Sequence, residues 1–143
     1  MLINTASAAI SFARELEQDG AKFYEGLSQR YPQSRDTFLA MARDNRKNVA
    51  QVQAVYYSVI SDAIEGCFAF NINTEEFRLK TRLAEATTYV EDLGNALEIE
   101  DTMIKFYSEA AEQSRSLLAD IPRTFDLIAR KRSERTATLK SLQ

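Results

Sequence analysis

Glu17-Gln-Asp-Gly-Ala-Lys-Phe-Tyr24 is followed 83 residues later by Glu100-Asp-Thr-Met-Ile-Lys-Phe-Tyr107, which has the same Glu, Lys, Phe and Tyr spacing. A second pair of stretches, Met41-Ala-Arg-Asp-Asn45 and Ile128-Ala-Arg-Lys-Arg132, is 87 residues apart. The two offsets differ little, so the halves of the chain look like copies of one unit. A repeated unit of this length predicts a pseudo-twofold arrangement of the two halves.

Apolar residues recur at the 3.6-residue period of an amphipathic helix in four segments of the chain. Only four glycines and two prolines interrupt the 143 residues, which favours long helices over short strands. We expect helices over about 6–31, 32–65, 83–116 and 120–142. The first and second segments are joined almost directly, as are the third and fourth, so each pair is predicted to form an antiparallel hairpin.

The connection between the two hairpins is longer than the connections within them. An extended chain of about 16 residues reaches roughly 50 Å, which exceeds the length of the predicted helices. We therefore predict one all-α domain over 1–143, a four-helix bundle with hairpins over about 5–65 and 83–142 and a crossover over about 66–82. One long crossover between two hairpins is the ferritin-like arrangement. Residues 74–82 of the crossover are expected to hold a short helix.

Each predicted helix carries a polar residue near the middle of its apolar stripe. Two of the helices carry a second one three residues later, on the same face. A buried charge is unfavourable unless it is paired, so the pattern predicts one shared polar centre. The alternative is a wide stripe from which some of these side chains reach solvent. The six residues are Glu17, Asn45, Asn48, Glu100, Arg132 and Arg135.

The composition excludes several classes of active site. The chain has no histidine, which removes Ser-His-Asp and Cys-His catalysis and the commonest imidazole metal ligand. It has no glycine-rich phosphate loop, and its one cysteine cannot form a zinc cluster. A net charge of −3 and the lack of a long apolar run predict neither a nucleic-acid nor a membrane partner. Cys67 cannot form an internal disulfide, which suits the cytoplasm.

On these motifs the chain resembles the rubrerythrin-like branch of the ferritin-like superfamily over nearly its whole length. In that family, the first helix of each hairpin supplies a Glu seven residues before a Tyr, and the second supplies Glu-x-x-His. Together these residues hold two iron or manganese ions. Glu17 and Glu100 match the first element, with Tyr24 and Tyr107 as the aromatic residues beside the site.

The resemblance places the second element where this chain has no Glu or His. Asn45 and Asn48 occupy the positions in one hairpin, and Arg132 and Arg135 occupy those in the other. Amides bind such metals weakly and guanidinium groups do not bind them. The two arginines would instead supply the positive charge between Glu17 and Glu100, because guanidinium pairs well with carboxylate. We therefore expect no metal, no cofactor and no catalytic residue, and a structural or binding role.

Three other interpretations start from different residues. A displaced metal site would add Asp44, Asp101 or Glu134 to Glu17 and Glu100, giving an oxidoreductase that uses iron or manganese. A pocket for a small molecule would be lined by Tyr24, Tyr56, Tyr57, Tyr107 and Phe23. A nucleic-acid surface would use Arg130, Lys131, Arg132, Arg135 and Lys140, although these residues surround their helix and do not share one face.

The helices also have apolar residues to spare for a protein partner. Long amphipathic helices of this kind pack against a second copy, so we predict a homodimer and allow for an unidentified protein partner. Cys67, in an apolar part of the crossover, is expected to be a packing residue. The residues expected at the interface between copies are Val55, Tyr57, Ile60, Phe68 and Phe70.

Overall fold

Threonine side chains fix the starts of two long helices. The Thr5 hydroxyl accepts a hydrogen bond of 3.1 Å from the backbone N–H of Ala8, and α1 begins at the next residue, Ala6. At the start of α4, the Thr88 hydroxyl accepts from the Glu91 N–H at 3.1 Å, and the Glu91 carboxylate accepts from the Thr88 N–H at 3.4 Å. Such a reciprocal pair satisfies two backbone donors that the helix itself leaves unpaired.

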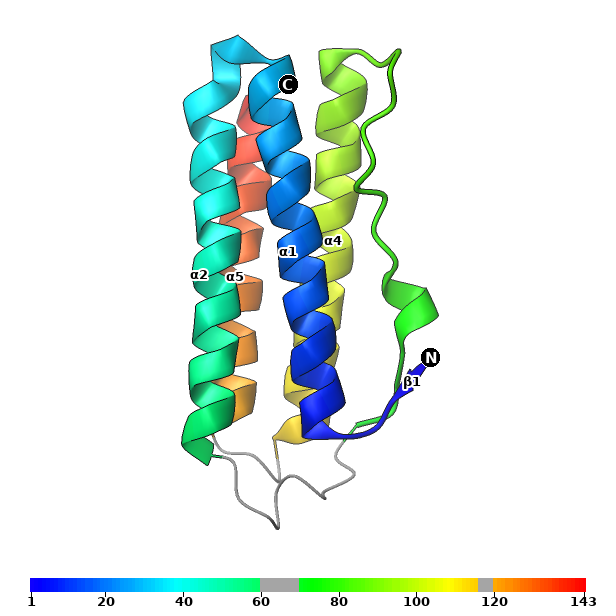
Figure 1. Cartoon of the computed structure of the whole chain (residues 1–143), viewed down its shortest axis with the longest axis vertical. Helices are drawn as coiled ribbons and strands as arrows, with labels where there is room; N and C mark the ends of the chain where they lie inside the picture. Colours follow the sequence, from blue (N-terminus) through cyan, green and yellow to red (C-terminus); the bar gives the residue numbers. More distant parts are fainter. Residues whose placement is uncertain (60–69, 116–119) are drawn as a thin grey trace.

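The computed structural model describes residues 1–59, 70–115 and 120–143, and long helices make up most of them (Figure 1). A 3₁₀ turn, η1 (Pro32–Ser34), joins the first two helices. The predicted all-helical bundle is confirmed. The long helices are α1 (Ala6–Arg30), α2 (Arg35–Val59), α4 (Tyr89–Ser114) and α5 (Asp120–Ser141).

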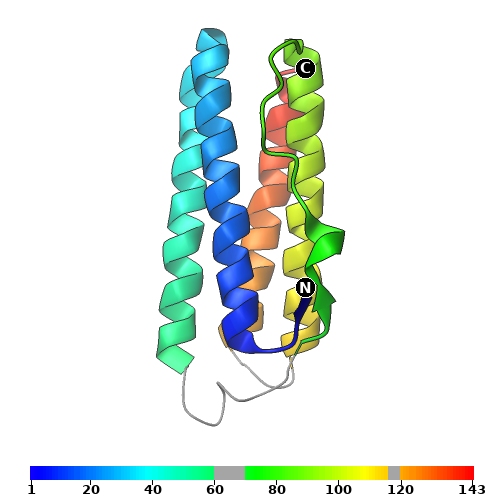
Figure 2. The same ribbon diagram turned by 45° about the vertical axis from the view of Figure 1, so that its right-hand side comes forward.

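The helices are arranged as two neighbouring pairs. Helices α1 and α2 run antiparallel to each other, and so do α4 and α5 (Figures 1 and 2). The pairs meet so that α2 lies beside α5 and α1 beside α4. All four helices therefore face one central space, and that space is where their buried polar side chains gather.

Residues 70–88 run along α4 from one end of the bundle to the other (Figures 1 and 2). Near its start this segment contains β2 (Ile72–Asn73), which pairs antiparallel with β1 (Leu2–Ile3), and the 3₁₀ helix η2 (Thr74–Phe77). Leu83, further along, packs so closely on α1 that a Cβ added to Gly26 would lie 2.6 Å from its Cδ1. The segment is thus held along its length by contacts with the bundle.

Two predicted helix boundaries were wrong. The third helix was expected from residue 83, but α4 begins only at Tyr89, because the reciprocal cap at Thr88 ends the extended segment there. The short helix expected over 74–82 is limited to η2, since the chain becomes extended again at Arg78. In addition, the helix expected from residue 32 begins with η1. The predicted end of that helix, at residues 60–65, lies outside the described residues.

Aromatic rings fill the core on both sides of the bundle's midpoint. Tyr24 stacks on Phe38 with ring centroids 6.3 Å apart, and Tyr107 lies against Phe125 at 5.7 Å. These rings are fully buried. Burial of each large apolar side chain stabilises the fold by about 1.5–3 kcal/mol. This stabilisation offsets the unfavourable desolvation of the polar groups between the rings.

Candidate functional site: a buried Arg–Glu centre

Six polar side chains from all four helices meet in the middle of the bundle. We call this set the polar centre. Glu17 comes from α1, Glu100 from α4, an asparagine pair from α2 and an arginine pair from α5. The exposed fractions are 0% for Glu17, Asn45 and Glu100, 1% for Arg132, 4% for Asn48 and 9% for Arg135.

The Arg132 guanidinium lies between the two carboxylates. Its Nη1 donates to both oxygens of Glu100, at 2.7 and 2.9 Å, and its Nη2 donates to Oε2 of Glu17 at 2.5 Å. Burial disfavours the charge on Arg132, but the negative charges of Glu100 and Glu17 outweigh burial and raise the pKa of the guanidinium. Arg132 therefore stays a cation inside the bundle.

The two tyrosines of the repeated motif donate hydrogen bonds to the two carboxylates in a crosswise arrangement. The Tyr24 hydroxyl donates to Glu100 at 2.8 Å, and the Tyr107 hydroxyl donates to Glu17 at 2.7 Å. Each tyrosine thus serves the glutamate of the other half of the chain. Burial, followed by the adjacent carboxylate, raises the pKa of both tyrosines well above the usual value. Both hydroxyls accordingly remain protonated donors.

The second arginine is held by α2. Arg135 donates to the side-chain oxygen of Asn45 at 2.5 Å and to the backbone carbonyl of Met41 at 3.2 Å. Its Nη1 lies 3.6 Å from Glu100, and its guanidinium carbon lies 5.3 Å from the centre of the Tyr24 ring. The second positive charge is therefore shared among a carboxylate, an amide and an aromatic face.

The asparagines connect α2 to the first carboxylate. The Asn45 amide donates to the backbone carbonyl of Glu17 at 3.1 Å, and the Asn48 amide donates to its side chain at 3.4 Å. Gly20 leaves the room for this contact, since a Cβ at that position would lie 2.4 Å from the Asn45 nitrogen. A glycine one turn after Glu17 is thus a requirement of the site.

The polar centre is neutral, with two carboxylates and two guanidinium groups. All four carboxylate oxygens of Glu17 and Glu100 accept from protein donors, namely Arg132, Asn48 and the two tyrosines. Across residues 1–59, 70–115 and 120–143, no three Asp, Glu or Cys side chains are grouped so that they would hold a metal ion. Chemically, the arrangement is a closed ion-pair network.

The acids proposed for a displaced metal site lie outside the polar centre. Asp44, Asp101 and Glu134 are all exposed. Asp101 pairs with Lys105 on the surface of α4 at 3.0 Å. Asp44 and Glu134 line a groove between α2 and α5. The structure therefore does not bring these three acids together with Glu17 and Glu100.

The residues of the other two interpretations are also separated. Phe23, Tyr24 and Tyr107 are core residues, whereas Tyr57 is 68% exposed, so the five aromatic side chains do not share one environment. In the basic set of α5, Arg132 and Arg135 are turned into the polar centre, so the five residues do not form one surface for an extended phosphate backbone. The basic residues of that set that do face solvent are Arg130, Lys131 and Lys140.

The predicted surface between copies is only partly described. Tyr57 is exposed, but Phe70 is 5% exposed because it packs into the core, so its assignment to the surface was wrong. Val55 packs partly against the core. Ile60, Phe68 and Cys67 lie outside the described residues.

One buried polar cluster was missed from the sequence. Asp92 accepts hydrogen bonds from Tyr31, from Arg30 at 3.1 Å and from Thr87 at 2.8 Å. Burial opposes the charge on Asp92, but these three donors outweigh it and lower the pKa of the carboxyl group. The cluster ties residues 87–88 to the end of α1. No periodic signal marks it, because Arg30, Tyr31 and Thr87 lie at helix ends or outside helices.

Comparison of the chain with protein-family models, with curated proteins and with solved structures gives no match. Within the described ranges, no helix has both the length and the apolar character needed to cross a membrane. The function must therefore be argued from the residues of the polar centre and its surroundings.

Proposed function

We propose that the protein is a rubrerythrin-like member of the ferritin-like superfamily in which an Arg–Glu network replaces the two metal ions. In this proposal, the protein has no catalytic activity and acts through a structural or binding role. The observation that carries the proposal is the contact of one guanidinium, that of Arg132, with both Glu17 and Glu100.

Position and charge support this substitution. A dimetal site places cations among carboxylates at the centre of a four-helix bundle. Arg132 and Arg135 put two positive charges at the centre of this bundle, on the helix and at the spacing where the family has Glu-x-x-His. The long segment over residues 70–88 precedes α4 in the sequence and runs beside it in space. This course supports the ferritin-like crossover between the hairpins.

Saturation of the carboxylates supports a non-catalytic role. Catalytic metal sites keep an open coordination position for a substrate or water. Here every oxygen of Glu17 and Glu100 is already bonded, so metal binding requires Arg132 to leave. Removing Arg132 alone would leave buried carboxylate charge uncompensated, at a cost of about 3–5 kcal/mol.

We further propose that the protein works as a homodimer or with another protein. Tyr57, at the end of α2, is the large apolar side chain of the expected interface that faces solvent. A cytoplasmic location is part of the same proposal and rests on the single cysteine. Light scattering at high micromolar concentration tests the dimer, and a clean monomer would remove it from the proposal.

Metal analysis of protein purified without chelators tests the proposed loss of metal. We expect less than about 0.1 iron or manganese ion per chain and no metal-dependent peroxidase or oxidase activity after incubation with either ion. Stoichiometric metal accompanied by activity would instead establish the oxidoreductase with a site at Glu17 and Glu100.

A further inference from the structure

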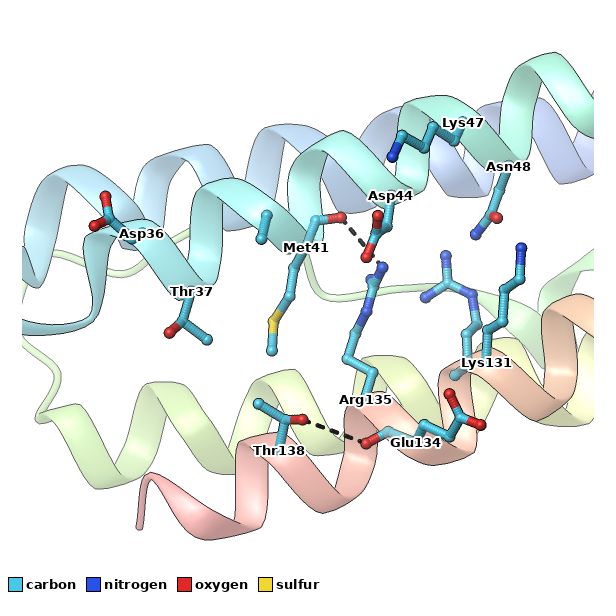
Figure 3. Close-up of a pocket in the computed structure, with 12 residues that line it drawn as sticks. Asp36, Thr37, Met41, Asp44, Lys47, Asn48, Lys131, Glu134, Arg135 and Thr138 are labelled. Carbon is cyan, nitrogen blue, oxygen red and sulfur yellow. Dashed lines mark hydrogen bonds between the residues drawn. The ribbon is translucent and has the colours of Figure 1, made fainter.

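The groove between α2 and α5 leads from solvent to the polar centre. It has a volume of about 750 Å³, and Figure 3 shows its two walls, one from each helix. Asn48, Arg132 and Arg135 line its inner part and are each nine-tenths or more buried. The groove therefore ends against polar side chains that belong to the bundle's interior.

Two lysines flank this inner part from opposite walls. Lys47 lies on α2 next to Asn48, and Lys131 lies on α5 next to Arg132. In Figure 3, Lys131 extends from α5 toward Asn48 on the facing helix. Neither lysine forms an ion pair with a side chain in the described part of the chain. Two unpaired positive charges on one groove favour an anion between them.

The inner part of the groove also offers unused hydrogen-bond donors. The Nε of Arg132 is buried and has no hydrogen-bond partner among the described residues. The Asn48 amide makes only a long contact of 3.4 Å with Glu17. A buried donor without a partner is unfavourable by about 1–3 kcal/mol, so an acceptor that bonds to it would be favoured. Because this Nε is shielded, an acceptor in the groove reaches it only if neighbouring side chains move.

Acidic residues restrict the anion to one end of the groove. Asp44 precedes Lys47 by three residues on α2, and Glu134 follows Lys131 by three residues on α5. Because the two helices are antiparallel, the backbone positions of the lysines share one end of the groove and those of these acids share the next turn, about 4.5 Å along the axis. The Lys47 side chain extends along α2 toward Asp44 (Figure 3). Asp36 lies further in the same direction. Glu17 and Glu100, below, are already balanced by Arg132 and Arg135.

We propose that this groove binds a small oxyanion, a phosphate or a carboxylate group, between Lys47 and Lys131 and over Asn48 and Arg132. The inference rests on the proposed function, because the donors of the inner part exist only while arginine and asparagine replace the metal ligands. The inference names the chemical class of ligand that the proposed binding role would serve. A tetrahedral or planar oxyanion supplies several acceptor oxygens, which matches the donors of Lys47, Lys131 and Asn48 at this end of the groove.

Titration of the full-length protein at low ionic strength tests this site. We would add sodium phosphate or sodium succinate, with sodium chloride at matched ionic strength, and follow the Asn48 side-chain amide and the Arg132 Nε–H by NMR. We expect saturable shifts of both signals with a Kd of about 1 mM or tighter for at least one oxyanion and none with chloride. The stronger of the two arms identifies phosphate or carboxylate as the preferred group.

Charge variants separate a built site from general attraction. Lys47→Gln with Lys131→Gln is expected to weaken binding at least about tenfold. Lys22→Gln with Lys80→Gln changes the net charge equally at exposed positions outside the groove and should leave the Kd within about twofold. A Kd weaker than about 1 mM for both oxyanions, or equal losses in both double variants, would overturn the site. The result of this titration does not depend on the metal content of the protein. Metal analysis therefore tests the proposed function separately from the oxyanion site.

Discussion

Replacing Arg132 with methionine removes the guanidinium from between Glu17 and Glu100 and keeps a long, unbranched side chain. The arginine is 1% exposed and donates three hydrogen bonds to two carboxylates that are fully buried. Removing one partner of a buried ion pair leaves uncompensated charge, with a loss of about 3–5 kcal/mol. We therefore expect Arg132→Met to lose a large part of the 5–15 kcal/mol that is typical of a folded domain.

Urea denaturation followed by far-UV circular dichroism measures this loss. With a slope of about 2 kcal/mol per molar urea, the midpoint should fall by about 1.5–2.5 M. Arg130→Met, on the exposed surface of the same helix, is the matched control and should change the free energy of unfolding by less than about 0.5 kcal/mol.

A double variant distinguishes unpaired charge from lost packing. Glu17→Gln added to Arg132→Met removes one carboxylate charge for the one guanidinium charge lost, leaves Glu100 facing Arg135 at 3.6 Å, and leaves the cavity unchanged. Neutral replacements of a buried ion pair are often tolerated, so most of the lost free energy of unfolding should return. If Arg132→Met unfolds at the wild-type midpoint, or if the double variant is no better than the single one, the polar centre is not an ion-pair network.

Three further predictions concern the space, the pH dependence and the ancestry of the site. Gly20→Ala should destabilise by about 1–3 kcal/mol in urea, because its Cβ would meet Asn45 at 2.4 Å, whereas Gly94→Ala, with nothing within 4 Å, should be neutral or stabilising by up to about 1 kcal/mol. Asp92→Asn should lower stability at neutral pH by about 1–3 kcal/mol. Burial opposes the charge on Asp92, but its hydrogen bonds hold the folded pKa below that of an ordinary aspartate. Its contribution is therefore present above the ordinary pKa and is lost as the pH falls through the folded pKa. Wild type and variant should converge in acid denaturation, and a constant difference would contradict this. Asn45→Glu, Asn48→His, Arg132→Glu and Arg135→His together should bind about two divalent ions and gain thermal stability with them. Calorimetric titration that shows a folded quadruple variant ignoring iron, manganese and zinc would mean that the register of these four positions is wrong.

The helical bundle and the members of its polar centre were predictable because both depend on periodicity. Glu17, Asn45, Glu100 and Arg132 each interrupt an apolar stripe near the middle of its helix. Four such interruptions, one on each helix, predict one polar centre in the bundle. The pairing of arginine with Glu17 and Glu100 was expected from charge, but the remaining contacts were not predictable. The crosswise bonds of Tyr24 and Tyr107 depend on the relative placement of helices that are distant in the sequence.

Contacts at helix ends account for the errors. The sequence around residues 83–88 is compatible with a helix, but Thr88 and Glu91 form a cap and Thr87 bonds to Asp92. These are local polar contacts that compete with helical hydrogen bonds and carry no periodic signal. The buried position of Phe70 likewise follows from where the extended segment runs along α4, which no local pattern encodes.

The repeat in the sequence does not extend to the charges of the site. Each half supplies one glutamate and one tyrosine, but both cations come from α5 and both amides from α2. The asymmetry makes α5 the source of both positive charges at the bundle's centre, and Arg132 from this helix contacts both α1 and α4. It also leaves the amide side facing the groove, where the proposed oxyanion would bind.

Anomalous diffraction from crystals grown without chelators and soaked in iron or manganese tests the replacement of metal by arginine most directly. The proposal predicts a guanidinium between Glu17 and Glu100 and no anomalous peak within the bundle. A strong peak at about 2–2.3 Å from oxygens of both glutamates, with Arg132 turned away, would contradict it.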